Sequence, residues 1–490
     1  MRILYLDLDT LRPDHLGCYG YHRNTSPNID RIAAGGMRFE NVYCSDAPCL
    51  PSRAALMTGC FGIHNGVVNH GGTCADRPPE GSERSFRDRL ASGGSWANVL
   101  RDAGLRTCYV GGFGERHSAY WYYAGFHEIY DTAKGGLESA EDVTPIALDW
   151  ISRNAAKDNW YLHVNYWDAH TPYRAPAAFG NPFESDPLPD WLTEETLQQH
   201  RMLAGPHGAQ EIAMYDSRSD PRWPRQPGEL RDLQDWRRLV DGYDTGIRYM
   251  DSHIGQLLQE LEVLGLLDDL VIIVSSDHGE NLGELGSYAE HATADQITCR
   301  VPLIVRWPGV TPTGAVDVGL HYQLDLLPTL AELLKRPSKP WWDGISMGTT
   351  LRGAGGSMRD ELILSQCCHV CQRSVRWDRY LYMHTYHDGY HLFPPEMLYD
   401  LAADPHEQHN LATFRPDLCR EGAWRLMNWH DAAMATMPRG RTSDPLQEVL
   451  DEGGPFHARG YLRGYIERLK ATGRADKVAE LERRHPRELR

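Results

Sequence analysis

The sequence predicts an α/β fold in which helices cover a central, mixed and mostly parallel sheet, with a smaller C-terminal subdomain built on an antiparallel sheet. Two patterns carry this prediction. Short apolar runs rich in branched and aromatic residues alternate with helical periodicity through most of the first 355 residues. After about residue 355 the pattern changes to short strands that follow one another closely. Hydrophobic residues make up 41% of the 490 residues, which is enough for a substantial core.

Five runs are expected to form core strands, because each is short, apolar and followed by polar residues or glycine. They are residues 3–8, 107–111, 160–165, 270–275 and 301–306. The expected helices between them are residues 95–103, 142–155 and 230–264. Because ligands gather at the carboxyl ends of strands in such sheets, the residues that follow these strands are the first candidates for a functional site.

The second half of the chain is expected to be divided. We expect a catalytic domain over residues 1–355 and a C-terminal subdomain over 356–490, with a small antiparallel sheet and a helical tail. The expected strands of this sheet are residues 361–365, 372–377, 380–384 and 397–401. Residues 175–230 are rich in Pro, Asp and Arg and show little periodicity, so we expect a long surface insertion. The charged tail after residue 440 is expected to be a surface or interaction element.

The net charge and the hydropathy of the chain limit the classes of partner that it is expected to bind. The formal net charge of -17 argues against a nucleic-acid partner, because phosphate backbones favour clustered Lys and Arg. An anionic ester can still bind, since local cations and a metal ion override the net charge. No stretch approaches the roughly 20 apolar residues that span a bilayer, so we expect no membrane partner. The N-terminus reaches Asp7 too early for a signal peptide, and we expect a cytoplasmic protein.

The eleven cysteines show no regular spacing, which indicates free thiols in a chain without an export signal. The segment CCHVC, with Cys367, Cys368 and Cys371, resembles half of a zinc site. No second CxxC or HxxxH accompanies it, so free thiols are the favoured interpretation.

Three stretches concentrate chemically active residues at strand ends or at a helix start. Asp9 stands where the first strand ends, and Asp277 and His278 directly follow another apolar strand. Cys49 precedes a helix with a proline near its first turn, and a helix N-terminus favours an anion. Two carboxylates and an imidazole suit one divalent cation. Their mostly oxygen ligation favours calcium, with manganese and magnesium as alternatives, over zinc.

The sequence CLPSR at 49–53, followed by AALMTG, resembles the motif of the type I sulfatases, in which the cysteine is oxidised to formylglycine. These enzymes belong to the alkaline-phosphatase-like superfamily. Five more blocks match in the family's order: SPNID (26–30), SDHGE (276–280), RVPLIVRWPG (300–309), DLLPTL (325–330) and MLYDLAADPHEQHNLA (397–412). The resemblance therefore covers most of the chain.

The resemblance implies a specific chemistry. Cys49 would become an aldehyde that is hydrated to a gem-diol, one hydroxyl of which attacks sulfur while the other later expels sulfate. The resemblance also implies that the metal ligands are Asp9, Asp277, His278 and residue 49, and that Arg53 holds the diol. A formylglycine-generating maturation enzyme would be a required partner.

Two histidines match family positions for acid or base catalysis: His170 in WDAHTPY, and His291, which falls where the family usually has a substrate-binding lysine. The chain also departs from the family. It lacks the Gly-Lys-Trp-His run that holds nucleophile and sulfate in many sulfatases, and Arg116 and His117 are the expected substrate-binding replacements. Thr10 stands where a second acid is common, and His278 where many members have Asn, so the choice of metal stays open.

The sequence thus predicts a hydrolase of sulfate monoesters that acts on a small organic or sugar sulfate. A phosphonate monoester or phosphodiester hydrolase of the same superfamily, which can share the formylglycine and the Asp-His ligand pair, is the first alternative. An inactive sulfatase-like binding protein is the second. The sequence leaves the oligomeric state open, although the C-terminal tail is a candidate for a homo-oligomer contact.

Overall fold

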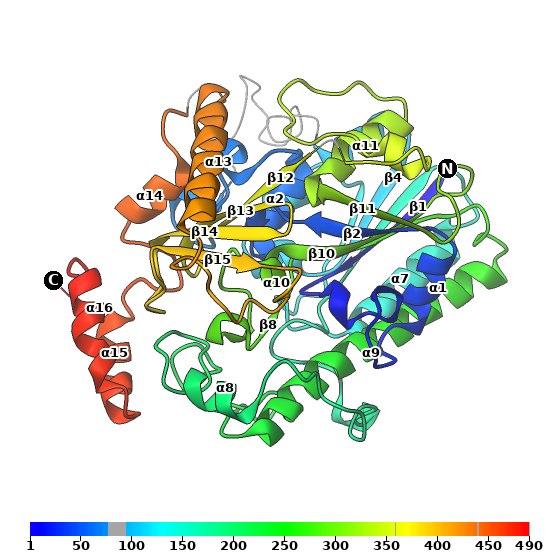
Figure 1. The fold of residues 1–490 in the computed structure, drawn as a ribbon. Coiled ribbons are helices and arrows are strands. Elements are labelled where there is room, and N and C mark those ends of the chain that lie inside the picture. The colour runs from blue at the N-terminus through cyan, green and yellow to red at the C-terminus, as the bar shows by residue number, and fades with distance from the viewer. Residues whose placement is uncertain (77–94, 358, 439–440, 490) are drawn as a thin grey trace.

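The computed structural model describes residues 1–76, 95–357, 359–438 and 441–489, and its centre is an eight-stranded sheet (Figure 1). The strands, in spatial order, are β11 (Ala315–Tyr322), β2 (Met37–Tyr43), β10 (Arg300–Arg306), β7 (Val271–Ser275), β1 (Arg2–Leu8), β6 (Trp160–Tyr166), β4 (Arg106–Val110) and β5 (Glu128–Tyr130). Only β10 runs antiparallel to its two neighbours, β2 and β7. The predicted mixed, mostly parallel sheet is confirmed.

Helices cover both faces of this sheet. One face carries α1 (Pro27–Ala34), α7 (Ala140–Asn154) and α9 (Leu233–Val263), which lie together on one side in Figure 1. The other face packs on α2 (Cys49–Thr58), α5 (Trp96–Asp102) and α11 (Leu326–Leu333). Strand β1 shows why: Leu4 and Leu6 pack into the first core, whereas Ile3 and Tyr5 pack into the second. Alternate side chains of a strand point to opposite faces, so a strand that is apolar throughout must be covered twice.

Helix starts are set by side-chain caps that hydrophobic periodicity does not reveal. Asp232 accepts hydrogen bonds from the backbone N–H groups of Gln234 and Asp235, so α9 begins at Leu233 rather than at the expected residue 230. A reciprocal pair between Ser139 and Asp142 starts α7 at Ala140, ahead of the expected residue 142.

A second, five-stranded sheet has the order β15 (Glu396–Asp400), β14 (Tyr380–His387), β13 (Cys371–Trp377), β12 (Glu361–Gln366) and β3 (Asp46–Ala47). The first four strands are antiparallel, as the sequence predicts. The fifth comes from the N-terminal part of the chain and pairs with β12 in parallel, through Ser365 opposite Asp46. Because β3 directly precedes α2, the C-terminal sheet helps to fix the segment that leads into Cys49.

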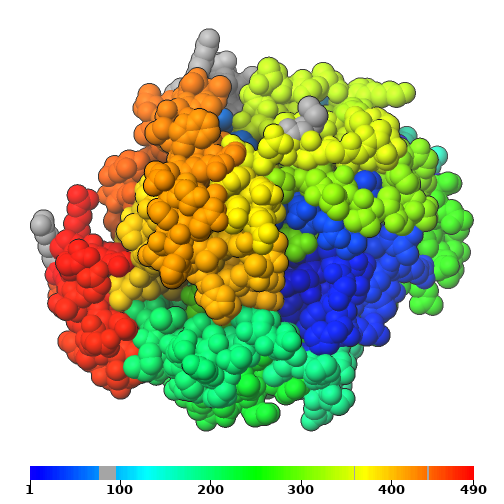
Figure 2. Space-filling model, in the orientation of Figure 1, coloured from blue at the N-terminus to red at the C-terminus, as the bar shows by residue number. Residues whose placement is uncertain are grey.

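The segment between residues 175 and 230 is largely irregular, with only η5 (Ala177–Phe179) and α8 (Glu194–His200) as helical turns. The expectation of a surface insertion is wrong for residues 204–212, which are buried. There, Glu211 pairs with Arg474 at 2.7 Å and accepts a hydrogen bond from Tyr465. The C-terminal helices therefore lie against this segment, as Figure 2 shows for the red and green surfaces.

The remaining helices and strands are short or belong to the C-terminal part. They are α3 (Gly62–Asn65), α6 (Phe113–Arg116), β8 (Asn281–Leu282), β9 (Tyr288–Glu290), α10 (Gln296–Cys299), α12 (Gly348–Leu351), α13 (Pro416–Ala435), α14 (Pro445–Asp451), α15 (Leu462–Ala471) and α16 (Val478–Arg484). Among the helices that the structure describes, none is both long enough and apolar enough to cross a membrane.

Candidate active site

Two strand ends and one helix start meet at a single point. Asp9 follows β1, Asp277 and His278 follow β7, and Cys49 is the first residue of α2. Strands β1 and β7 are parallel neighbours, with Asp7 opposite Ser275, so their carboxyl ends emerge side by side. One ligand atom from each of Asp9, Cys49, Asp277 and His278 lies within 4.8 Å of the others. These four residues are called the primary centre below.

Cys49 contacts His278 in the primary centre. Its Sγ lies 3.0 Å from His278 Nε2. The other ring nitrogen, Nδ1, lies 2.9 Å from the carbonyl oxygen of Gly279, which only accepts hydrogen bonds. Nδ1 therefore carries the proton, and the Nε2 lone pair faces Cys49. The sequence places Cys49 at a helix start rather than in the core; the helix start is right, but the side chain is also buried, with 2% exposed.

The carboxylate of Asp277 is only half satisfied. Its Oδ1 accepts hydrogen bonds from the backbone N–H groups of Thr10, at 3.1 Å, and His278, at 3.0 Å. Its Oδ2 is buried and makes no hydrogen bond to the described residues, although Arg53 Nε lies 3.2 Å away. A buried carboxylate oxygen without a hydrogen bond is costly, so this oxygen fits a bound cation. Thr10 donates its hydroxyl to Asp9 at 2.7 Å and so supports that carboxylate.

Arg53 forms ion pairs with three acidic side chains of the site. Its guanidinium is buried, pairs with Asp9 at 2.9 Å and with Asp277, and makes a further ion pair with Asp7. Asp7 also pairs with His163 at 2.9 Å. The sequence gives no firm role to Asp7, because a shared face with Asp9 needs a strand that stays regular to its end. Strand β1 runs to Leu8, and both carboxylates reach Arg53.

His170 and His291 stand over the primary centre, as expected. Their ring centroids are 5.3 Å apart, and the His291 ring lies 4.1 Å from that of His278. His170 Nδ1 donates to the carbonyl oxygen of Thr171, which leaves Nε2 as the acceptor. Burial lowers the pKa of His170 well below its ordinary value, and nearby arginines lower it further. Burial is also the main reason why the pKa of His291 is lowered, so both rings are neutral before substrate binds.

The two expected substrate-binding residues lie at the end of α6. His117 brings a ring nitrogen within 4.8 Å of Cys49 Sγ and of a nitrogen of His70, and its Nε2 is buried without a hydrogen-bond partner among the described residues. Arg116 is exposed, and its positive charge contributes to the lowered pKa of His170. Both residues therefore belong to the rim of the same site.

Two further histidines, His457 and His369, lie near the site, and the sequence predicts no role for either. His457 comes from the tail that was expected at the surface, yet its Nε2 lies 3.0 Å from His70 Nδ1. Its ring stacks on His369 with centroids 4.2 Å apart. His369 lies inside CCHVC, where the cysteines rather than the histidine suggest a metal. Among the described residues, no cluster of potential metal ligands includes Cys367, Cys368 or Cys371. All eleven cysteines are free thiols.

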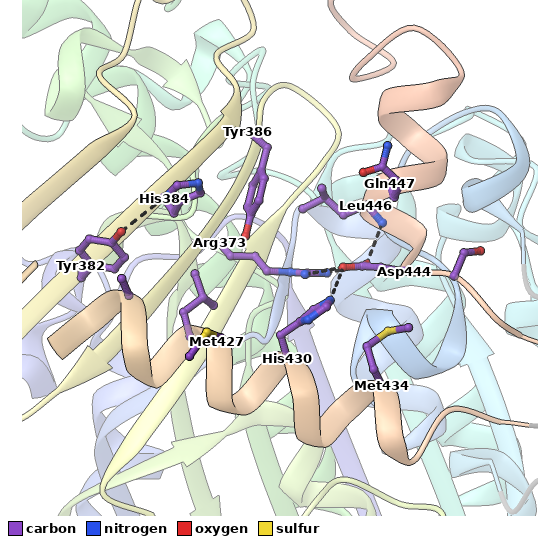
Figure 3. A pocket seen from close by; sticks show the side chains of 13 residues that line it. Arg373, Tyr382, His384, Tyr386, Met427, His430, Met434, Asp444, Leu446 and Gln447 are labelled. Carbon is purple, nitrogen blue, oxygen red and sulfur yellow. Dashed lines mark hydrogen bonds and ion pairs between the residues drawn. The ribbon is translucent and has the colours of Figure 1, made fainter. Parts of the chain in front are cut away.

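A separate pocket of about 590 Å³ lies between α13, β14 and α14 (Figure 3). Its lining residues are Arg373, Tyr382, His384, Tyr386, Ala423, Leu426, Met427, His430, Met434, Ser443, Asp444, Leu446 and Gln447. The Asp444 carboxylate is already occupied by Arg373, at 2.6 and 2.7 Å, and by His430, at 3.2 Å. None of the candidate catalytic residues lines it, so the active site stays assigned to the strand ends.

Comparison with known proteins extends these findings. A model of the family described as Sulfatase matches residues 2–335. A choline-sulfatase from Rhizobium meliloti (strain 1021) is 27% identical over 439 residues, which cover 79% of this chain and 77% of that protein.

Solved structures share the fold. A protein in complex with its substrate D-glucosamine-2-N,6-O-disulfate aligns with a TM-score of 0.71 at 18% identity, over 88% of this chain and 98% of the other. A phosphonate monoester hydrolase from Agrobacterium radiobacter aligns with a TM-score of 0.69 at 19% identity, over 88% and 96%. Because the family model covers most of the sequence, the chain belongs to the sulfatase family and has its alkaline-phosphatase-like fold.

Proposed function

We propose that the protein hydrolyses sulfate monoesters of small organic or sugar alcohols, with residue 49 as the nucleophile. The observation that carries this proposal is the primary centre itself. A cysteine at the buried N-terminus of α2 faces two carboxylates and an imidazole with a fixed tautomer, in a chain of the sulfatase family. The histidines above this centre and Arg116 at the rim suit an anionic ester.

One divalent metal ion is the proposed cofactor, held by Asp9, Asp277, His278 and residue 49. The Oδ2 of Asp277, which makes no hydrogen bond to the described residues, and the lone pair of His278 Nε2 support this assignment. Mostly oxygen ligands favour calcium, with manganese and magnesium as alternatives. When bound, such an ion lowers the pKa of a hydroxyl nucleophile and offsets the negative charge of a sulfate group.

The unmodified thiol is poorly suited to attack, which supports oxidation of Cys49 to formylglycine by a maturation enzyme. Burial raises the pKa of Cys49 well above its ordinary value, and the charges of Asp9 and Asp277 raise it further. The thiol therefore stays protonated near neutral pH, whereas the thiolate is the nucleophilic form. A hydroxyl nucleophile at this position does not depend on that ionisation.

The surrounding side chains orient the ester and handle its protons. Arg53 holds Asp9 and Asp277 in position. Arg116 and the buried nitrogen of His117 contact the anionic oxygens of the substrate. The neutral rings of His170 and His291 take up a proton near the nucleophile and return one to the departing alcohol oxygen.

The first experiment is mass spectrometry of the peptide that spans Cys49, on protein produced together with a formylglycine-generating enzyme. We expect the aldehyde mass, together with turnover of an aryl sulfate by the same preparation. An unmodified thiol despite a competent maturation enzyme would contradict the nucleophile assignment. Protein that carries the aldehyde but binds no metal and cleaves no ester would favour the inactive binding protein.

A phosphonate monoester hydrolase is the second candidate, favoured by two departures of the site from the usual sulfatase residues. His278 supplies an imidazole to the centre where many sulfatases have Asn, and Arg116 and His117 replace the usual lysine-containing run. The structural likeness to such a hydrolase supports only the fold at 19% identity. Turnover of an aryl sulfate and an aryl phosphonate monoester should be compared on one preparation. Preference for the phosphonate by orders of magnitude would replace the sulfate assignment.

A further inference from the structure

Three buried residues next to the primary centre form a second group of side chains that could bind a metal ion: His207, Glu290 and His369. They come from the irregular segment after α8, from the end of β9 and from the turn between β12 and β13. His207 Nε2 lies 2.9 Å from Glu290 Oε2, and His369 Nε2 lies 3.5 Å from Glu290 Oε1. One ligand atom from each lies within 4.8 Å of the other two. These three residues are called the histidine group below.

The tautomer of His207 points an unshared electron pair at the carboxylate. His207 Nδ1 lies 3.0 Å from the carbonyl oxygen of Ile212, so Nδ1 carries the proton in the neutral ring. Nε2 then faces Glu290 with its lone pair, and it is buried without a hydrogen-bond partner among the described residues. Two electron-rich atoms at 2.9 Å repel each other unless a proton or a metal cation lies between them. His278 in the primary centre has the same arrangement, with Gly279 as the acceptor.

The histidine group is buried and includes a carboxylate, which suits a metal cation. His207, Glu290 and His369 are 6%, 4% and 4% exposed. A buried carboxylate beside two imidazoles suits a bound cation, because a buried negative charge is costly unless it is compensated.

The backbone holds the group in place at a cost in free energy. His207 has a φ of 55° and Ala289 a φ of 50°. Both values lie in the left-handed region, which residues other than glycine rarely adopt. The N–H of His207 donates to Met214, and the N–H of Tyr288 donates to the carbonyl oxygen of His207, each at 2.9 Å. Strained residues therefore flank or supply two of the three ligands, on segments that are hydrogen-bonded to each other.

We propose that the histidine group is a second metal site, which takes a zinc-type ion. Two imidazoles and one carboxylate form a three-residue zinc set that leaves a fourth position open, and imidazole suits zinc much better than calcium. The site is linked to the active site, because Glu290 Oε1 also lies 3.0 Å from His291 Nε2. An ion held by Glu290 thus fixes the carboxylate that positions His291. This inference does not depend on which ester the protein cleaves.

The test is the zinc content of the intact wild-type protein, incubated with ZnCl2 in the presence of excess CaCl2 and then freed of loosely bound metal. We expect about one zinc per chain in the wild type, and loss of this zinc in His207→Gln and in His369→Gln. His321→Gln is the matched control. His321 is also buried and pairs with Asp317 at 2.8 Å, but this pair belongs to no three-ligand group among the described residues.

Cobalt separates the two sites. The visible absorption bands of Co²⁺ bound by the histidine group should persist in Asp277→Asn, which disables the primary centre, and vanish in His369→Gln. Circular dichroism establishes that each variant is folded. Equal zinc content in wild type and His369→Gln would overturn the proposal. So would zinc that is lost in Asp277→Asn and kept in His369→Gln, since the ion would then belong to the primary centre. Neither measurement requires turnover, so the result stands apart from that of the proposed function.

Discussion

The primary centre and the histidine group lie close together, yet they are built in different ways. The primary centre stands on the carboxyl ends of β1 and β7 and on the start of α2, all of which are fixed by the two hydrophobic cores. The histidine group stands on an irregular segment, a three-residue strand and a turn. In the primary centre, regular structure places the ligands. Backbone strain is found in only one of its three segments, at Thr10, directly after Asp9. In the histidine group, backbone strain and loop hydrogen bonds place the ligands.

The two groups also differ in the atoms that they offer. The primary centre brings two carboxylates, one imidazole and the residue 49 side chain, with Arg53 beside them. The histidine group brings two imidazoles and one carboxylate. Oxygen-rich sites select calcium, magnesium or manganese, whereas imidazole-rich sites select zinc and its neighbours. The two groups would therefore select ions of different kinds and would not compete for the same ion.

The largest expected effect comes from Cys49→Ala, which removes the nucleophile from the primary centre and leaves the histidine group intact. We expect turnover of an aryl sulfate to fall by at least ~10³-fold, because loss of a nucleophile removes the main reaction path. The protein should stay folded, with a loss of about 1 kcal/mol from the small buried cavity.

Steady-state kinetics and thermal unfolding check this expectation, with Cys44→Ala as a matched control. Cys44 is also a buried cysteine, with 1% exposed, but it lies in the core between the two sheets. Residual activity near that of the wild type in Cys49→Ala would refute the nucleophile assignment.

The second effect, His278→Ala, distinguishes the two metal sites. We expect the affinity for the primary ion to fall by about 10-fold to 100-fold or more, together with the rate, because His278 Nε2 faces the centre with its lone pair. Zinc bound by the histidine group should remain. Elemental analysis of the dialysed variant measures both ions at once. Unchanged content of the primary ion would remove His278 from the ligand set, and loss of both ions would show that the sites are not independent.

The same contrast explains how much of the site could be predicted from the sequence. Asp9, Asp277 and His278 directly follow strands whose apolar runs are readable, and parallel strands end at a common edge, so their convergence follows from the fold class. Cys49 and Arg53 lie in a motif that leads into a helix. Five of the eight central strands, the helices α5, α7 and α9, and four strands of the second sheet were predictable for the same reason, whereas β2, β5 and β11 were not among the expected strands. The periodicity of the predicted strands and helices is strong.

The histidine group was not predictable, because nothing local marks its residues. His207 lies in a segment without periodicity, and its burial depends on the C-terminal helices, which pack there through Glu211 and Arg474. His369 lies between cysteines, and in this segment the cysteine spacing, not the histidine, resembles a metal-binding motif. The parallel pairing of β3 with β12 escaped prediction for a related reason, since it joins segments more than 300 residues apart through only two residue pairs.

The smallest expected effect concerns a third group, His387, Asp388 and His485, which has similar residue types but no metal in our assignment. Here burial opposes protonation, but Asp388 and Glu488 raise the pKa of His485 to about 9. A protonated imidazole repels a cation, and its proton already neutralises Asp388, which lies 2.8 Å away. This group is therefore an ion pair that ties the C-terminal helix to β14.

The raised pKa sets the sign of the pH dependence. The stabilisation by His485 is complete below the unfolded-state pKa of about 6.5 and is lost as the pH rises through about 9. After allowance for solvent screening, we expect it to contribute about 1 kcal/mol to the free energy of unfolding at pH 6.5. Urea unfolding of wild type and His485→Gln at pH 6.5 and pH 9.5 measures it, because titrating groups that do not contact His485 cancel in the difference. The gap between the two proteins should shrink at pH 9.5. A gap that is widest at high pH, or zinc bound by His387 and His485, would mean that this group is a metal site like the histidine group.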